Sequence, residues 1–409
     1  MTALLLLVYI VFAIAVQLAV GLGIAFWRWR RARAASAAST GEARTLSAPA
    51  WPGWRDFRVT RRTPEDASGS QYSFYLQPVD RAPLPTYLPG QFLTFDVPVA
   101  DTSSGSGTVT RCYSLSDKPA ADCYRVTIKR ALVPPSAPNA RPGIASAYFH
   151  DVVREGHVLR VKAPSGQFCL DPDPAIPSIL IAGGVGITPV MSMLLWAVAE
   201  QPGRTIHLYY GVRNSADQAF RKILEHLAAA NSNLQVTVVY ERPLPGDVEG
   251  RDFQYSGYID IGLLRLTAPA GARCRYYICG PPPMMASLVP ALRTSGIPEA
   301  DINFEAFGPA SLEPAKRGTR SALAEPIDVR FERSKRTLAW DGRDATLLDF
   351  AERKGIAMES GCRSGSCGTC ETRVVSGTVR NTQAGAYEVA TGHCLPCISE
   401  PGSALVLDA

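Results

Sequence analysis

Four cysteines near the C-terminus constrain this chain more than any other feature. Three of them stand in the spacing C-x4-C-x2-C within Glu359–Cys370, read ESGCRSGSCGTC, and another follows in LPCISEP. Four thiolates can hold two irons and two bridging sulfides, and this spacing is typical of a 2Fe–2S cluster. Small residues fill the gaps, as a loop requires whose backbone N–H groups approach sulfur. The predicted metal ligands are Cys362, Cys367, Cys370 and Cys397.

Alternative interpretations of these cysteines stay open. A zinc site would favour paired C-x2-C knuckles, and Cys394–Cys397 is the one such pair besides that in the loop. Buried structural cysteines are another possibility, and Cys394 competes with Cys397 as fourth ligand. Residues 327–409 resemble a plant-type ferredoxin domain, which favours Cys397 and the cluster. Two expected strands and a helix at Thr346–Lys354 precede the loop, as in the ββα start of a β-grasp fold.

Length and composition set broad limits. A chain of 409 residues has room for two to four domains. The cysteines outside the cluster set form no regular disulfide framework, so we expect a reducing compartment. The net charge of +5 is concentrated in residues 28–44, where five arginines face one glutamate. The rest of the chain is nearly neutral, which gives no reason to expect nucleic acid as a partner.

The N-terminus predicts a single membrane anchor. Ala3–Trp27 holds 25 residues without a charge. As a helix it would be roughly 37 Å long, enough to cross a hydrocarbon core of ~30 Å. A cleaved signal peptide is the alternative, but basic residues follow the apolar run and none precedes it. We therefore expect a transmembrane segment at 1–27, a basic flexible tether at 28–50, and the remaining domains in the cytoplasm.

Residues 51–172 read as an antiparallel β-barrel, because short alternating strands are separated by turns that contain proline and glycine. The stretch RCYSLSDKP carries side chains suited to a flavin. Arg111 could pair with a phosphate, Tyr113 could stack on a flat heterocycle, and the Ser114 hydroxyl could bond its edge nitrogen. An ordinary exposed strand would explain this tripeptide equally well if it stood alone.

A second stretch of this half, GIASAYFHD, predicts the start of a helix. Gly143 and Ser146 would place the helix N-terminal amides against a pyrophosphate. The histidine in this stretch, His150, is expected to be structural rather than catalytic.

Residues 173–311 read as a parallel α/β domain. An apolar strand at Ser178–Ala182 runs into GGVGITP and then into an apolar helix. The glycines expected to let a diphosphate approach that helix are Gly183, Gly184 and Gly186. A later strand, YYICG, ends at Cys279-Gly280-Pro281, and α/β sheets bind ligands at the carboxyl ends of their strands.

In series, these motifs resemble the ferredoxin–NADP reductase superfamily, and closely the reductase half of flavohaemoglobins and the oxygenase reductases. The resemblance implies FAD, with FMN as the alternative, and a catalytic set of Ser114, Thr188 and Cys279. It places Thr188 and Cys279 beside the nicotinamide and flavin rings, with Phe307 covering the flavin. Gly280 and Pro281 join the cofactor-binding residues. Arg213 either meets a 2′-phosphate or faces solvent near Asp217, and NADH is favoured over NADPH.

The sequence therefore predicts a multidomain membrane-anchored reductase. Electrons would pass from NADH to flavin, then to the cluster and to a separate acceptor protein such as an oxygenase, desaturase or cytochrome-like protein. A linker at 312–326 would separate the nicotinamide half from the ferredoxin domain. Two alternatives are a subunit of a respiratory NADH-oxidising complex and a membrane-tethered redox sensor. In the Na+-pumping NADH:quinone reductase, however, the ferredoxin domain directly follows the anchor, whereas here it comes last.

Overall fold

A computed structural model describes most of the chain beyond its N-terminal segment. The described residues are 50–98, 107–132, 143–269, 273–305, 307, 325–361, 363, 365, 367–382, 387 and 389–409. The predicted transmembrane segment 1–27 lies outside them, and so do nearly all of the tether and the linker. Within the described ranges, every helix is too short or too polar to cross a bilayer.

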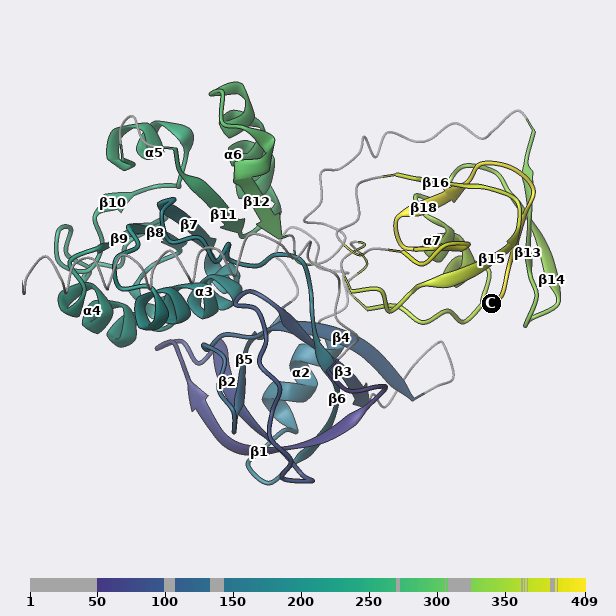
Figure 1. The fold of residues 1–409 in the computed structure, drawn as a ribbon, viewed down its shortest axis with the longest axis horizontal. Coiled ribbons are helices and arrows are strands. Elements are labelled where there is room, and N and C mark those ends of the chain that lie inside the picture. Colours follow the sequence, from purple (N-terminus) through teal and green to yellow (C-terminus); the bar gives the residue numbers. More distant parts are fainter. Residues whose placement is uncertain are drawn as a thin grey trace, which may run out of the picture. The chain divides into compact units, whose positions relative to one another are not determined.

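The described residues of the part 51–172 form a curled antiparallel sheet, as predicted. Over the described residues its strand order is β4-β3-β6-β1-β2-β5, and a bridge between Leu115 and Val126 joins its two edges. The helix α2 (Ile144–Asp151) packs on this sheet through Phe149, whose ring contacts those of Phe74, Phe95 and Tyr113. The strands are β1 (Arg55–Pro64), β2 (Gln71–Pro78), β3 (Phe92–Pro98), β4 (Thr108–Ser114), β5 (Tyr124–Lys129) and β6 (Val158–Ser165) (Figure 1).

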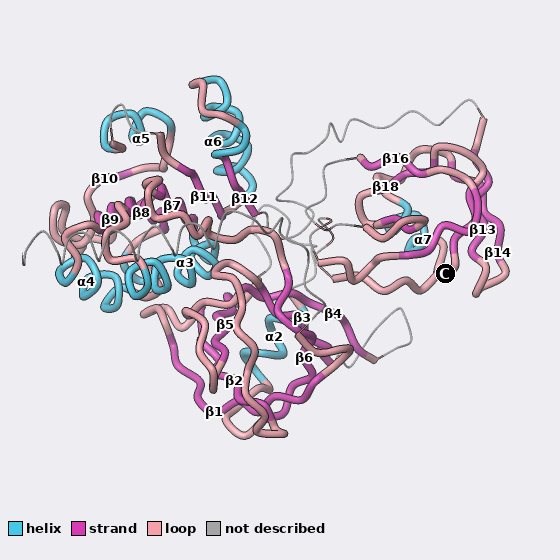
Figure 2. Tube along the Cα trace, in the orientation of Figure 1, coloured by secondary structure: helices cyan, strands magenta, loops and turns pink. Residues whose placement is uncertain are grey.

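The described residues of the part 173–311 form a parallel sheet, as predicted, and helices cover both of its faces. Its order over the described residues is β10-β9-β8-β7-β11-β12. The strands are β7 (Ser178–Gly183), β8 (Ile206–Val212), β9 (Leu234–Tyr240), β10 (Tyr255–Ser256), β11 (Arg275–Cys279) and β12 (Ile302–Glu305). The helices are α3 (Ile187–Glu200), α4 (Arg221–Ala230), α5 (Ile261–Thr267) and α6 (Pro282–Thr294). Figure 2 shows α3 and α4 on one face of this sheet and α5 and α6 on the other.

The strand β7 is buried on both faces because it lies inside this sheet. Its side chains alternate between two cores: Leu180 packs with α3 and α4, whereas Ile179 and Ile181 pack with α5 and α6. A continuous apolar run is what a parallel strand between two helical layers requires. The carboxyl ends of β7, β8, β9 and β11 consequently share one edge of the sheet, where the glycine-rich turn lies.

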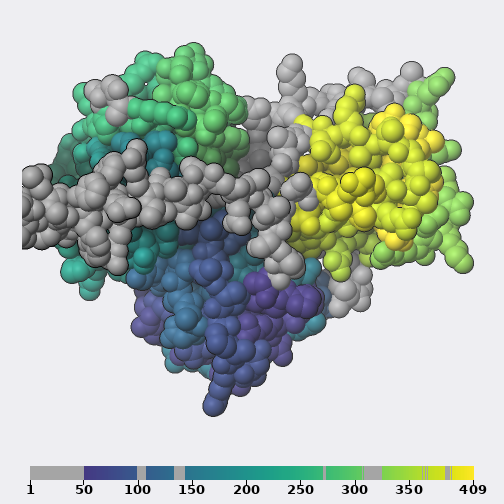
Figure 3. All heavy atoms as spheres, in the orientation of Figure 1, coloured from purple at the N-terminus to yellow at the C-terminus, as the bar shows by residue number. Residues whose placement is uncertain are grey.

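The C-terminal part has the mixed sheet expected of a β-grasp fold, with the order β14-β13-β19-β15-β17 over the described residues. Its strands are β13 (Ile327–Phe331), β14 (Arg336–Trp340), β15 (Thr372–Ser376), β17 (His393–Cys394) and β19 (Leu405–Leu407), with a separate pair β16 (Val379–Asn381) and β18 (Ser399–Pro401). The helix α7 (Leu347–Arg353) begins after Thr346, whose hydroxyl accepts from the Asp349 backbone N–H at 3.2 Å. The atoms of this part, yellow-green to yellow in Figure 3, form one continuous body.

Candidate active site and cluster site

The glycine-rich turn after β7 lies directly against the turn after β11. A Cβ at Gly186 would lie 2.1 Å from the Cys279 carbonyl oxygen, so any side chain there would push the two turns apart. Gly184 has a φ of +53°, which favours glycine, and a Cβ there would meet nothing within 4 Å. The turn is therefore closely packed at Gly186 and open at Gly184. An open turn at the start of α3 is what a diphosphate site requires.

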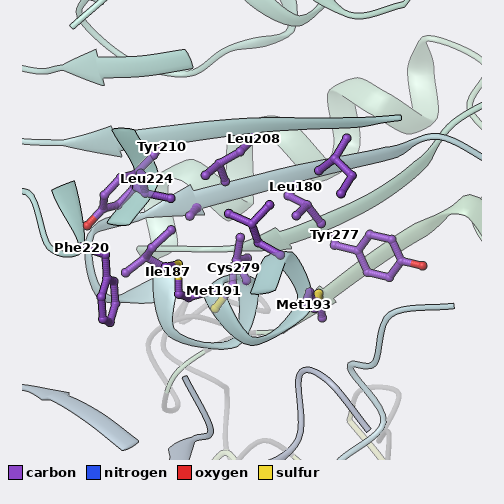
Figure 4. Packing of buried hydrophobic residues seen from close by; sticks show 14 of the residues in the cluster. Leu180, Ile187, Met191, Met193, Leu208, Tyr210, Phe220, Leu224, Tyr277 and Cys279 are labelled. Carbon is purple, nitrogen blue, oxygen red and sulfur yellow. The ribbon is translucent and has the colours of Figure 1, made fainter. Parts of the chain in front are cut away.

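Thr188 and Cys279 lie at this junction but are both buried. The Thr188 hydroxyl donates to the Val185 carbonyl at 3.0 Å, so it shapes the turn. The Cys279 side chain has no exposed surface and lies in the core near Ile187 and Met191 (Figure 4). Burial, and then the neighbouring Glu305, raise the pKa of Cys279 well above its usual value. Its thiol therefore stays protonated, and a thiolate mechanism is disfavoured.

The structure brings an acidic residue to this site that the sequence analysis did not select. Glu305 ends β12 and pairs in register with Cys279 on β11. Its Oε2 accepts a long hydrogen bond of 3.4 Å from the Ser114 hydroxyl at the end of β4. Both side chains are buried. The signal that could have identified Glu305 is a carboxylate closing the short strand INFE, directly before AFGP.

Arg111 and Tyr113 occupy β4, next to Ser114. The Tyr113 ring contacts the rings of Phe149 and Phe95 at centroid distances of 5.2 and 5.8 Å. Arg111 donates to the Thr110 carbonyl at 2.7 Å, and burial lowers its pKa. A cation that loses hydration on burial gains most from a nearby anion. This pair fits a flavin with a phosphate group, with the ring of Tyr113 as the platform.

The helix α2 starts where the sequence predicts, with Gly143 as its N-cap residue and Ser146 in its first turn. The N-cap residue Gly143 leaves the helix without a side-chain cap. The Ser146 hydroxyl donates to the Gly143 carbonyl at 2.8 Å and accepts from the Ala131 N–H at 3.0 Å. It thus ties the helix start to the end of β5, which leaves the backbone amides as the expected phosphate ligands. His150 is structural, since its Nε2 lies 3.0 Å from the Ile128 carbonyl oxygen.

The remaining predicted nucleotide residues lie at the end of β7 or follow β11 and β12. A Cβ at Gly183 would lie 2.6 Å from the Pro281 Cδ, and one at Gly280 would lie 2.1 Å from the Met284 Cε. These residues keep the two turns close, and Pro281 is the N-cap of α6. Phe307 is 36% exposed, so its predicted cover over a flavin ring stays a prediction.

Two of the four predicted cluster cysteines lie side by side. The Cys370 and Cys397 sulfurs are 3.2 Å apart, whereas Cys394 is buried in the hydrophobic core of the C-terminal part. Cys367 lies against Gly361, where a Cβ would come within 2.9 Å of its sulfur. This arrangement fits Cys397 rather than Cys394 as a ligand. Cys362 lies outside the described residues, and within them no group of three metal-ligating side chains is found.

Comparison with known proteins agrees with this division of the chain. The model of the oxidoreductase NAD-binding domain matches residues 180–289, and that of the 2Fe-2S iron-sulfur cluster binding domain matches residues 329–402. The flavohemoprotein of Rhodopirellula baltica is 39% identical over 264 residues, which are 63% of this chain and 62% of that protein. The chain thus spans less than two thirds of the length of this relative.

Two solved structures are similar to different shares of the chain. The FAD/NAD-binding domain of nitric oxide dioxygenase from Vibrio cholerae covers 63% of this chain and 100% of its own, at 28% identity and a TM-score of 0.54. Phthalate dioxygenase reductase covers 87% of this chain and 98% of its own, at 25% identity and a TM-score of 0.54.

Together, the fold, the site and these similarities define an oxidoreductase of the ferredoxin-reductase type. More particularly, the chain joins an FAD- and NAD-binding module to a 2Fe–2S domain, a set of modules similar to that of phthalate dioxygenase reductase.

Proposed function

We propose that this protein passes electrons from NADH through a flavin to its 2Fe–2S cluster, and from there to a separate acceptor such as an oxygenase component. The observation that carries the proposal is the meeting of Ser114, Cys279 and Glu305 in a chain that also holds a cluster domain. The similarity to phthalate dioxygenase reductase, described as transferring electrons from pyridine nucleotides to a 2Fe–2S centre, supports it.

The chain's own residues have distinct roles in this proposal. Arg111 and the first amides of α2 would hold the phosphates of FAD, and Tyr113 would orient its ring. Gly184 and Gly186 would admit the dinucleotide diphosphate. Ser114 and Glu305 would hold a proton between Oγ and Oε2, shielded from water by burial. The bound flavin supplies the conversion between two-electron and one-electron transfer.

We place the protein at a membrane by its N-terminal segment, with its other domains in the cytoplasm. The apolar run Ala3–Trp27 and the arginines that follow it support this placement. Fractionation of the full chain tests it: we expect the protein in the membrane fraction, and a variant lacking residues 1–34 in the soluble fraction with its reductase activity kept. A full chain found in the soluble fraction, or cleaved near residue 35, would contradict the anchor.

Anaerobic titration of the cofactor-loaded chain with NADH tests the electron route. We expect the flavin absorbance to bleach and the EPR signal of a reduced cluster to appear. A flavin that stays oxidised in excess NADH would contradict the nicotinamide assignment. A bleached flavin beside an oxidised cluster would contradict the cluster as the exit.

A further inference from the structure

A bound dinucleotide would place its adenosine ribose near the carboxyl ends of β8 and β9. In doubly wound folds, the residue after the strand next to the glycine-rich turn reads the ribose 2′ position, and an arginine there accommodates a 2′-phosphate. Arg213 holds that place directly after β8, and Glu241 holds the corresponding place after β9. Whether Arg213 is already paired with a carboxylate therefore decides whether it is available to bind a 2′-phosphate.

The arginines between residues 213 and 251 all have acidic partners. Arg213 Nη1 lies 3.2 Å from Asp217 Oδ2, and Arg242 Nη2 lies 3.1 Å from Glu241 Oε1. The other two, Arg221 and Arg251, both contact Asp252. A 2′-phosphate carries nearly two negative charges at neutral pH, so it would have to displace a carboxylate that stays nearby and repels it. This edge suits a ribose hydroxyl better.

The backbone of the short helix that carries Asp217 is held in place by residues between β1 and β2. The short helix η2 (Ser215–Asp217) is capped by Asn214, whose Oδ1 accepts from the Ala216 N–H at 3.1 Å. On its other side, the Ser68 N–H donates to the Ala216 carbonyl at 2.9 Å, and Gln71 Nε2 donates to the Asp217 carbonyl at 3.1 Å. Residues between β1 and the start of β2 thus donate hydrogen bonds to two consecutive carbonyls of η2.

Gln71 links the turn before β2 to η2, because its Nε2 donates to both Asp66 and the Asp217 carbonyl. Its side chain is fully buried, and its Nε2 also lies 3.2 Å from Asp66 Oδ2. The Asp66 carboxylate is fixed in turn by the Ser68 and Ser70 hydroxyls, at 2.9 and 2.5 Å, and by the Gln71 N–H at 3.1 Å. The two bonds of Nε2 orient the amide, whereas the buried Oε1 has no hydrogen-bond partner among the described residues. Through Nε2, Gln71 can transmit the position of the turn to η2.

We propose that Gln71 is a positioning residue for dinucleotide selectivity: it holds η2 so that Asp217 neutralises Arg213 and the site discriminates against a 2′-phosphate. The proposal rests on the function proposed above, because it concerns the nucleotide that feeds the flavin. It assigns to a residue of the barrel an effect on a site built by the parallel sheet.

The test compares NADH and NADPH as donors to ferricyanide, using the cofactor-loaded full chain. Asp217→Asn removes the charge that occupies Arg213, and we expect the ratio of kcat/KM for NADPH to that for NADH to rise about 10-fold. Gln71→Leu removes the hydrogen bond to the Asp217 carbonyl and keeps a side chain of similar volume. We expect the same ratio to rise about 5-fold, through KM rather than kcat. The matched control is Gln254→Leu, since the Gln254 side chain accepts from the Val238 N–H and does not hold η2.

A double variant decides whether Gln71 acts through Asp217. If it does, adding Gln71→Leu to Asp217→Asn should leave the ratio as it is in the single Asp217→Asn protein. A Gln71→Leu protein that loses activity equally with both nucleotides would overturn the proposal, because only a general loss of structure would remain.

Two further outcomes are distinguishable. Should Gln71→Leu fail to retain flavin, Ser70→Ala loosens the Asp66 anchor more gently and should shift the ratio in the same direction; an unchanged ratio there would overturn the proposal. A parent protein whose flavin neither nucleotide reduces would instead contradict the proposed function.

Discussion

The cluster loop and the flavin–nicotinamide site are built in opposite ways. The loop draws three of its predicted ligands from a stretch of nine residues, and their spacing is the main signal for the predicted metal chemistry. The other site joins Ser114 to Glu305 across 191 residues of sequence, and neither residue belongs to a motif specific enough to identify the site by itself. Chemistry held by local spacing should fail locally, whereas chemistry assembled by folding should depend on several distant elements.

The largest expected effect separates the two regions. Cys367→Ser removes one thiolate from a four-ligand site, so the cluster should be lost or become labile. NADH should still bleach the flavin, and ferricyanide should still be reduced, because these need only the first two parts of the chain. Cytochrome c reduction should fall to near background in a steady-state assay.

The matched control for this loss is Cys394→Ser. Cys394 is buried in the hydrophobic core and takes no part in the 3.2 Å contact of Cys370 with Cys397, so its variant should keep the visible absorbance of the cluster. A cluster-free Cys367→Ser protein that reduced cytochrome c at the parent rate would remove the cluster from the route.

A smaller effect is expected at the assembled site. Glu305→Gln keeps the shape of the side chain but removes its charge and its capacity to take the Ser114 proton. Positioned acid–base groups contribute on the order of 100-fold, so stopped-flow bleaching of the flavin by NADH should slow by about that factor. Flavin content should not change. The control is Glu299→Gln, an exposed carboxylate paired with Arg293, and equal slowing in both variants would exclude a specific role for Glu305.

Flavin retention should respond to Arg111. Arg111→Ala removes the expected phosphate partner, and a charge-assisted contact is worth about 1.5 kcal/mol or more, so flavin should bind at least 10-fold more weakly. The variant should purify with less flavin per cluster, as measured by absorbance. Arg61→Ala is the control, because Arg61 is an exposed arginine of the same barrel that stacks on Tyr75. Full flavin occupancy in Arg111→Ala would assign Arg111 another role.

The smallest effect is a pH dependence of the flavin half. Burial lowers the pKa of His150 on α2, so the unfolded chain takes up a proton there more readily than the folded one. The neutral side chain therefore favours folding above the ordinary pKa of about 6.5, and this contribution is lost as the pH falls below it. Urea unfolding followed by flavin fluorescence should show a steeper loss of stability between pH 7 and 5 in the parent than in His150→Gln. The exposed His226→Gln should behave as the parent, and an identical slope in all three proteins would show that His150 does not contribute.

Much of this architecture was predictable, for reasons that differ between its parts. The strand β7 and the helix α3 follow from an unbroken apolar run, a glycine-rich turn and an apolar helical pattern. Thr346 begins α7 as an N-cap should. Glu305 escaped prediction because one carboxylate at a strand end carries no signal until the neighbouring strand brings Cys279 beside it.

The sequence by itself predicted the order of the parts, a set of cluster ligands (Cys362, Cys367, Cys370 and Cys397) and a glycine-rich turn suited to a diphosphate, because spacing and glycine content act within a few residues. The tertiary structure decided which side chains are available for chemistry. It occupied the hydroxyls of Thr188 and Ser146 with backbone carbonyls and buried Cys279. It also set Gln71 against η2. Such contacts join residues far apart in the chain, and only the packing of complete sheets brings them within hydrogen-bond distance.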